Sequence, residues 1–526
     1  METPSIYFRL GNFDIPTIGG QEQPLNNVYL LGIQGVNYAF FPYWANNSNI
    51  YAVYRERTYT LAAGSVTNRG VINLFGYTVV TVIGSEIPTV FIQTESTSLD
   101  FIHASRSNRE DVHFLFVAAD GSLEHFGGGD MNGRGNTTWN MPKRPYNFRL
   151  ESGVSEPLFG MRPGRHWTLL ANYIDNTAIR NRLALDLAKE IGISHTSHSL
   201  PVDLFINNKF VGLYDLVERR SINHAINVSD LEARTRAVND RGLSNFEHLG
   251  VHRQGANGIT ANSIKYFDIP YNPEDITGGF VLEVELPNRY MSDPSGFVTS
   301  RYTIINLNAP EIASYEQVRF ISNFFQGFED AIHSENGYND RGNHFSHYID
   351  VHSFALFYLL HEFLMDVDTA QTSFFMYKEA ISYGGSGRLY AGPAWDFDRT
   401  LGLAAGFHDI DLRTPNVFWA NQGLNRHRRV EYPHMFTQLW EHEYFVDIVL
   451  ELWNSDFAPL IRVLIGHEVS SNTIYLNSIE YYMAAVESSL YMDRIMHHGG
   501  QRAQVNNMLH FARARYAFLQ YHWNED

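Results

Sequence analysis

The chain has 526 residues, a hydrophobic content of 44% and a formal net charge of −18. Its length exceeds that of one ordinary domain and supplies enough apolar residues for a substantial core. The absence of cysteine excludes disulfide bonds, thiolate catalysis and cysteine-ligated zinc. The negative charge disfavours nucleic acids and anionic membranes as partners. No stretch of the sequence reaches the roughly 18–20 apolar residues that are needed to span a bilayer.

Residues 1–84 predict a small all-β module of the β-sandwich type. Short apolar or alternating runs are separated there by glycine, proline and Asn-Asn turns. No catalytic residues gather in this part. The aromatic residues Phe40, Phe41, Tyr43 and Trp44 favour core positions, with binding of a surface or of a sugar as the alternative.

Residues 87–150 predict paired strands around a glycine-rich segment. Strands are expected at 87–95 and 112–118, and five glycines follow within 126–135. Backbone N–H groups in such a segment can bind phosphate, and a bulged hairpin explains the glycines equally well. Neither a P-loop nor the usual kinase glycine loop is present.

A helix and a hairpin are expected next. Asp175 or Asn176 caps the helix, and Gly192 ends it. The stretch 201–218 predicts a β-hairpin that turns at its Asn-Asn pair. Glu218 ends this hairpin as a candidate hinge residue, lysine partner or metal ligand, or as the ion-pair partner of Arg219 or Arg220.

Residues 224–275 are polar and rich in asparagine and glycine, which indicates an inserted loop. The strand expected at 277–285 places Glu283 and Glu285 on one side. Helices are expected at 315–333 and beyond residue 402, where the apolar pattern returns.

The stretch 348–402 holds a cluster of acids. Asp350 is the natural cap of a helix that ends near Met365. A strand at 374–378, a glycine-rich turn and a returning strand predict a hairpin that brings Asp368 and Asp396 to neighbouring strand ends.

Clustered carboxylates beside aromatic residues need a cation, an ion pair or solvent. Oxygen ligands favour Mg²⁺, Mn²⁺ or Ca²⁺ over zinc. Helix capping and ion pairing are the alternative roles for these acids.

The order of these acids resembles the catalytic half of a protein kinase, although His-Arg-Asp is absent and Trp-Asp-Phe-Asp replaces Asp-Phe-Gly. The sequence is more similar to the CotH kinase family, the spore-coat protein H-like atypical kinases. The resemblance covers about residues 85–520 in six segments, which end with Gly392-Pro-Ala-Trp-Asp-Phe-Asp398.

The resemblance implies an α+β fold, with an atypical protein-kinase-like domain at 85–526 after the all-β module. Its β-rich, nucleotide-binding part would be 85–285, which includes the inserted loop. Its mainly helical part would be 286–526, which carries the catalytic aspartates.

The resemblance also implies a function. The chain would be an ATP-dependent kinase of Ser/Thr residues in secreted, surface or coat-type proteins, with Mg²⁺ or Mn²⁺. A basic, Ser-rich protein substrate would suit its acidity, and a secreted or cell- or spore-surface location is implied. The alternatives are a non-catalytic pseudokinase-like scaffold or surface-binding protein, and a metal-dependent hydrolase.

The resemblance assigns roles to single residues. Asp368 would orient or deprotonate the substrate hydroxyl, and Asp396, Asp398 and Gln371 would hold the metal. Cofactor binding would fall to Arg134, Asn136, Trp139, Lys143, Arg149, Glu218 and Trp395. Arg149 stands where the family commonly has lysine, so the phosphate contact is open between Lys143 and Arg149.

Overall fold

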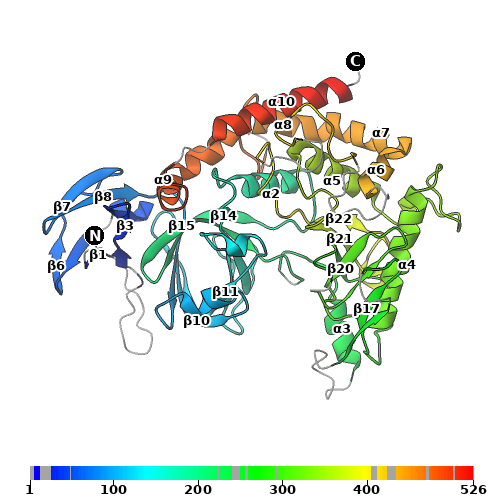
Figure 1. Ribbon diagram of the computed structural model, residues 1–526, viewed down its shortest axis with the longest axis horizontal. Coiled ribbons are helices and arrows are strands. Elements are labelled where there is room, and N and C mark those ends of the chain that lie inside the picture. The colour runs from blue at the N-terminus through cyan, green and yellow to red at the C-terminus, as the bar shows by residue number, and fades with distance from the viewer. Residues whose placement is uncertain are drawn as a thin grey trace. The chain divides into compact units, whose positions relative to one another are not determined.

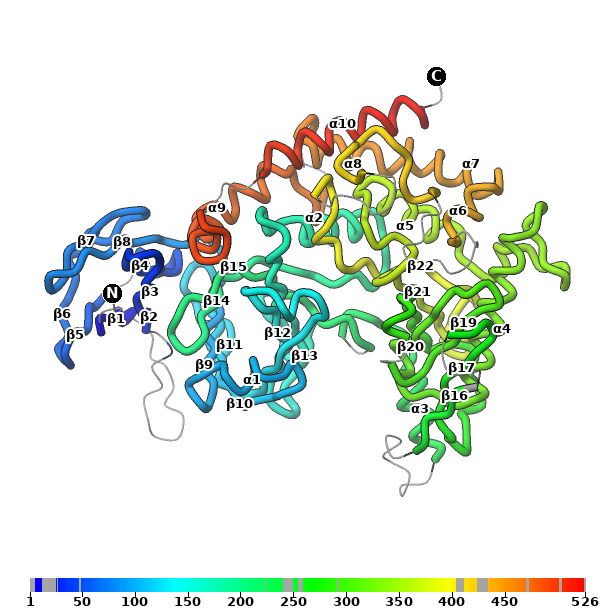
Figure 2. Tube along the Cα trace, viewed as in Figure 1, coloured from blue at the N-terminus to red at the C-terminus, as the bar shows by residue number. Residues whose placement is uncertain are grey.

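The computed structural model describes residues 5–11, 25, 27–47, 49–222, 224–239, 249–254, 259–290, 293–403, 411–422, 434–469, 473–500 and 504–524. They form a mixed α+β chain that begins with an all-β region, as predicted. Two compact units can be distinguished, each built from three segments (Figures 1 and 2). Unit 1 comprises Met1–Arg182, His198–Arg219 and Ile479–Val505, and unit 2 comprises Leu183–Ser197, Arg220–Ser478 and Asn506–Asp526.

Unit 1 begins with two four-stranded sheets, ordered β2-β1-β5-β6 and β3-β4-β8-β7. Strand β4 pairs with β8 in parallel, and the other pairs are antiparallel. The strands are β1 (Ile6–Leu10), β2 (Asn27–Tyr29), β3 (Leu31–Ile33), β4 (Val36–Phe41), β5 (Ile50–Tyr54), β6 (Arg57–Thr60), β7 (Gly70–Leu74) and β8 (Tyr77–Ile83).

A closed seven-stranded barrel follows, in the order β10-β11-β12-β13-β15-β14-β9. The parallel pair β9–β14 closes it, and the predicted hairpin is the β14–β15 pair, with Asn207 and Asn208 both in the left-handed conformation. The strands are β9 (Thr89–Thr94), β10 (Arg109–Val117), β11 (Leu123–Gly133), β12 (Tyr146–Leu150), β13 (His166–Leu170), β14 (Ser199–Ile206) and β15 (Lys209–Glu218).

The helices α1 (Asp100–Ala104) and α9 (Ile479–His497) accompany these strands in unit 1. Helix α2 (Arg180–Glu190) begins at the end of the first segment of unit 1, and its residues from Leu183 onward belong to unit 2. The N-terminal end of α2 is capped by Asp175, whose carboxylate accepts hydrogen bonds from the N–H groups of Ile179 and Arg180. Helix α9 comes from near the end of the chain and packs against β15 and β8.

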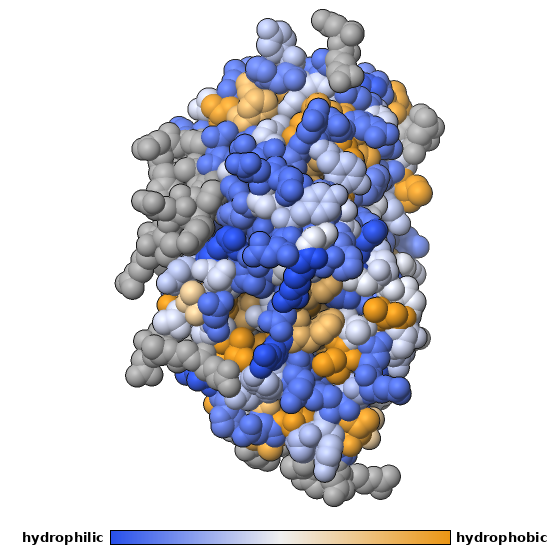
Figure 3. All heavy atoms as spheres, turned by 90° about the vertical axis from the view of Figure 1, so that its right-hand side faces the viewer, coloured by the Kyte–Doolittle hydropathy of each residue, from blue (hydrophilic) through white to orange (hydrophobic). Residues whose placement is uncertain are grey.

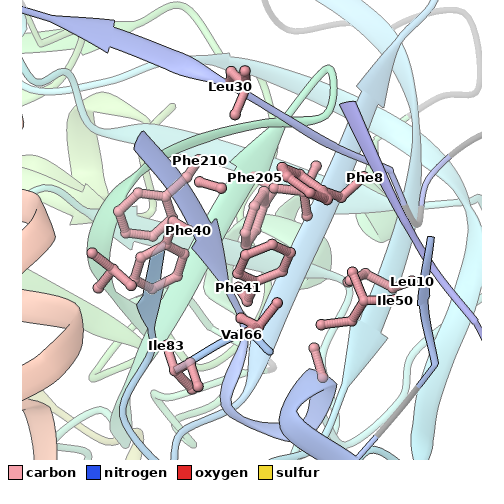
Figure 4. Close-up of a cluster of buried hydrophobic side chains, with 14 of the residues drawn as sticks. Phe8, Leu10, Leu30, Phe40, Phe41, Ile50, Val66, Ile83, Phe205 and Phe210 are labelled. Carbon is pink, nitrogen blue, oxygen red and sulfur yellow. The ribbon is translucent and has the colours of Figure 1, made fainter. Parts of the chain in front are cut away.

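The core of the N-terminal sheets is shared with the barrel (Figure 4). Phe40 of β4 stacks on Phe210 of β15 with 3.7 Å between ring centroids, and Phe8 meets Phe41 edge-on at 5.1 Å. Phe40, Phe41 and Trp44 are buried, so the preference for core positions is confirmed for them. The domain boundary at residue 84 stays a prediction.

Unit 2 contains a seven-stranded sheet in the order β16-β17-β19-β20-β18-β21-β22. All of its described strand pairs are antiparallel. The strands are β16 (Val251–Gln254), β17 (Ile264–Phe267), β18 (Phe280–Val284), β19 (Gly296–Val298), β20 (Ile304–Ala309), β21 (Phe374–Lys378) and β22 (Tyr390–Ala391).

The helices of unit 2 follow the predicted apolar patterns. A capping box of Ser314 and Gln317 begins α4, and Asp350 caps α5 as predicted. The helices are α3 (Leu231–Val238), α4 (Tyr315–Ile332), α5 (Val351–Leu364), α6 (Met435–Trp440), α7 (Glu443–Leu452), α8 (Ala458–Leu464) and α10 (Val505–Trp523).

The segment 224–275 differs from the inserted loop that was expected. It contains α3, β16 and β17, and the last two extend the sheet of unit 2. The sheet also takes strands from both sides of the boundary expected at residue 285, because β18 lies between β20 and β21. Polar composition concealed these elements, since all three are short.

The surface shown in Figure 3 is mainly hydrophilic, as expected for a chain with a net charge of −18. On the face shown in Figure 3, hydrophilic side chains predominate and hydrophobic ones form small separate groups. Within the described ranges, no helix is both long and apolar enough to cross a membrane.

Candidate functional site

Helix α5 delivers the first acids from a fully packed position. Nearly all of its residues are buried, so the helix that was expected to end near Met365 is a core helix. Glu362 forms a buried ion pair with Arg515 and accepts hydrogen bonds from the N–H groups of Trp419 and Ala420. The ion pair with Arg515 and the hydrogen bonds from the backbone of Trp419 and Ala420 therefore fix the position of Glu362 near the end of α5.

The chain turns sharply after α5. Met365 has a φ of 50° and ends the helix, and the buried carboxylate of Asp366 lies 3.2 Å from His361 Nδ1. Asp368 is half-buried, and its carbonyl oxygen accepts hydrogen bonds from the N–H groups of Gln371 and Thr372 at 3.0 and 3.3 Å. This turn fixes the backbone of Asp368.

The predicted hairpin is present and joins the two acid-bearing segments. Strands β21 and β22 pair with Met376 opposite Ala391. The hydroxyl of Ser373 donates a hydrogen bond of 3.1 Å to the carboxylate of Asp396. Asp396 is exposed and has a φ of 70°, so a left-handed backbone presents its carboxylate.

The other predicted residues of this region are less accessible. Asp398 and Gln371 are buried, at 8% and 6% exposure. Trp395 is half-buried, and the guanidinium of Arg220 lies 5.4 Å from its ring centroid. The same guanidinium lies 3.3 Å from the ring centroid of Phe375.

Two glutamates near this hairpin, Glu283 and Glu285, lie in unusual surroundings, although the family resemblance assigned no role to either. Burial raises the pKa of Glu283 to about 7, with the nearby Glu285 and Asp293 carboxylates adding to the rise and Arg220 opposing it. Glu285 accepts a hydrogen bond from the hydroxyl of Thr372 at 2.5 Å. The signal that could have identified them was their alternation on the strand at 277–285.

In unit 1, three charged residues lie on adjacent strands of the barrel. Asp130 of β11 pairs with Arg109 of β10 and with Arg149 of β12, whose Nε lies 2.9 Å from both carboxylate oxygens. Arg149 is opposite His166 in the β12–β13 register. Burial, together with the surrounding Arg219, Arg165, Arg149 and Arg109, lowers the pKa of His166 to about 4. This face of the barrel is therefore cationic.

The side chain of Lys143 forms other interactions within unit 1. Its ammonium is buried, lies 2.6 Å from the Asp493 carboxylate of α9 and donates a hydrogen bond to the carbonyl of Leu213. The ring of Tyr214 covers it at 4.7 Å. Of the two residues considered for a phosphate contact, Arg149 is the more accessible, because 32% of its side chain is exposed.

Glu218 is also buried in an ion pair. It accepts hydrogen bonds from the backbone and guanidinium of Arg162 and from the N–H of His198. Arg162 is therefore a charge partner of Glu218. No sequence pattern indicated this partner, which approaches from another loop.

The glycine-rich segment is a barrel strand. Residues 129–133 of β11 pair with both β10 and β12, so their N–H groups belong to the sheet and do not form a phosphate-binding loop. A Cβ atom at Gly133 would collide with the ring of Trp139, so glycine there permits close packing. Trp139 in turn lies under the guanidinium of Arg144, at 4.7 Å.

Beyond this strand, Arg134 and Asn136 lie in a surface turn. Arg134 is half-buried, and its N–H donates to the carbonyl of Pro145. Asn136 is exposed and accepts a hydrogen bond from Arg106.

The CotH kinase protein family model matches residues 131–519. The chain belongs to this family. The match begins within the glycine-rich strand β11, covers Arg149 and the acid-bearing hairpin, and ends within α10. A comparison with curated proteins gave no match.

Membership of the CotH family indicates a kinase-like phosphotransferase, which would use ATP and a divalent metal. In the part of the chain that the structure describes, no three His, Asp or Glu side chains are grouped to hold a metal ion. Mg²⁺ in kinases is held by one or two carboxylates together with phosphate oxygens, and not by a cage of protein ligands. The exposed carboxylate of Asp396 fits this mode of binding, whereas Asp398 and Gln371 are buried.

Proposed function

We propose that this CotH-family chain transfers the γ-phosphoryl group of ATP to serine or threonine side chains of proteins, with Mg²⁺ or Mn²⁺. The observation that carries the proposal is the hydrogen bond between Ser373 and Asp396, which ties the segment after Asp368 to the exposed acid. An atypical protein-kinase-like fold is part of the proposal, and the family match supports it.

Each acid has a distinct role in this proposal. The carboxylate of Asp368 accepts the proton of the substrate hydroxyl, or orients it, while the hydroxyl oxygen forms a bond to the γ-phosphorus. The bond from that phosphorus to the β–γ bridging oxygen breaks, and ADP leaves with the electron pair. Asp396 would hold the metal, which neutralises charge on the phosphates when it is bound.

Arg149 would bind phosphate in unit 1. Its guanidinium can form paired hydrogen bonds with phosphate oxygens, as it now does with the carboxylate of Asp130. A basic, Ser-rich protein is the proposed substrate, because the chain has a net charge of −18. We further propose that these substrates are secreted, surface or coat-type proteins and that the enzyme has a matching location; membership of the family supports this.

The test is transfer of ³²P from γ-labelled ATP to a Ser-, Lys- and Arg-rich peptide, with Mg²⁺ or Mn²⁺. The set comprises the wild type, Asp368→Asn, Asp396→Asn and the control Asp268→Asn, whose carboxylate is exposed beside His252. Loss of the general base should lower the rate of the Asp368 variant by about 10²–10⁴-fold. The Asp396 variant should lose its response to added metal, and the control should match the wild type.

The same assay separates the alternatives. Phosphate release from ATP without peptide labelling would favour the metal-dependent hydrolase. Absence of both labelling and ATP-induced thermal stabilisation would favour the non-catalytic scaffold. In the surface-binding alternative, Phe40, Phe41 and Trp44 cannot serve as contact residues, because all three are buried.

A further inference from the structure

We propose that Glu283 and Glu285 are positioning residues, each of which holds one of the two acid-bearing segments through its own chain of contacts. The inference rests on the proposed function. Glu283 lies in β18, opposite Phe375 of β21, and Glu285 follows at the end of the strand. Alternate residues of a strand project from the same face, so both carboxylates face the same side of the sheet.

The chain of contacts from Glu285 leads to Asp368. The buried hydroxyl of Thr372 donates to Glu285 and accepts a hydrogen bond of 3.0 Å from Arg289. Arg289 also lies 3.3 Å from the Glu285 carboxylate. The N–H of Thr372 donates to the carbonyl oxygen of Asp368. Two consecutive hydrogen bonds thus connect Glu285 to the backbone of the proposed base.

The chain of contacts from Glu283 leads to Asp396. Asn308 of β20 donates a hydrogen bond of 2.8 Å to the Glu283 carboxylate and accepts one of 3.0 Å from Arg220. Arg220 then lies over the rings of Phe375 and Trp395. Trp395 directly precedes Asp396, so the stacked guanidinium restrains the backbone that presents this acid.

The chemistry of this face favours a positioning role over simple packing. The opposite face of the sheet is apolar, with Phe280 of β18 stacked on Phe320 of α4. Desolvating glutamates costs folding free energy that an apolar residue of similar volume would not cost. Such carboxylates are useful as hydrogen-bond partners that orient functional groups. Orientation matters because a small displacement of a reacting group lowers the rate strongly.

The test changes each chain of contacts separately in the full-length protein. Thr372→Val removes the hydroxyl beside Glu285, and Thr372→Ser restores it. Asn308→Leu removes the link between Glu283 and Arg220, and Asp268→Asn is the control. Thermal melting shows that each variant is folded.

We expect Thr372→Val and Asn308→Leu to lower kcat by about 100-fold, while the KM for ATP stays within about twofold. Thr372→Ser should recover most of the rate. Hydrogen–deuterium exchange gives a readout that does not depend on activity. Thr372→Val should accelerate exchange within 369–373 only, and Asn308→Leu within 392–398 only.

Wild-type kcat in both folded variants would overturn the positioning role, as would a Ser variant as impaired as the Val variant. A wild-type protein that transfers no phosphate would overturn the proposed function instead. In that case exchange alone decides the inference, and unchanged exchange in both segments would overturn it.

Discussion

At the scale of single residues, Glu283 titrates far from the range of an ordinary glutamate. Burial is the main cause, and the charges of Arg220, Glu285 and Asp293 modify it. A raised pKa in the folded chain means that the folded state binds this proton more tightly than the unfolded state does. The stabilisation is therefore complete below the ordinary pKa of 4.5 and is lost as the pH rises through about 7.

Replacing Glu283 by glutamine should remove this loss. We expect the melting temperature of Glu283→Gln, relative to the wild type, to rise between about pH 5 and about pH 8, because only the wild type must ionise a buried carboxyl. Thermal unfolding at both pH values checks this, with Asp268→Asn as the exposed control. An offset that does not change with pH would contradict it.

Some residues could be placed from sequence because their partners are local. Asp350 caps α5 from three positions before Ser353, and the turn at Asn207 and Asn208 needs only its own left-handed conformations. Lys143 could not be placed in this way. The kinase analogy suggests an acid on α2, but its partner is Asp493 on α9, which no local pattern indicates. Asp186 of α2 pairs with Lys189 instead.

At the scale of elements, the hairpin of β21 and β22 was predictable, because two apolar strands flank a glycine-rich turn. The sequence of the glycine-rich segment was compatible with a phosphate-binding loop and with a bulged hairpin. Its pairing with β10 and β12 shows that it is a strand. The functional role of β18 was not predictable, because it depends on cross-strand neighbours such as Asn308 and Thr372 that are far away in sequence.

Lys143, which precedes β12, and Arg149, which lies within β12, should respond oppositely to substitution. Lys143→Met leaves Asp493 buried without its partner, so the free energy of unfolding should fall by about 3 kcal/mol. Arg149→Met should leave stability nearly unchanged and reduce the thermal shift that ATP produces. Urea unfolding and melting with and without ATP check both statements.

The reverse pattern would assign the phosphate contact to Lys143. A variant of Arg144, which covers Trp139, serves as the matched control on the same segment.

At the scale of the whole molecule, the N-terminal sheets and the barrel depend on one another. Their common core includes Phe91, Phe205 and Phe210 of the barrel, all of them buried. A chain that begins at residue 85 would expose these rings. Because large exposed apolar patches promote association, we expect this truncated chain to aggregate.

Size-exclusion chromatography and light scattering of the two chains test the expectation. A monodisperse truncated chain with a melting temperature equal to that of the full chain would contradict it and would support an independent module at 1–84.

The pairing of Lys143 with Asp493 also has a consequence for the order of events during synthesis. At about 5–20 residues per second, a ribosome reaches Asp493 on the order of tens of seconds after Lys143. The barrel strands emerge long before α9, which supplies the counter-charge and packs on β15. Until then Lys143 lacks the Asp493 carboxylate, and the surface of β15 on which α9 packs stays uncovered. Chains released early would therefore lack this ion pair and leave that surface accessible to proteases.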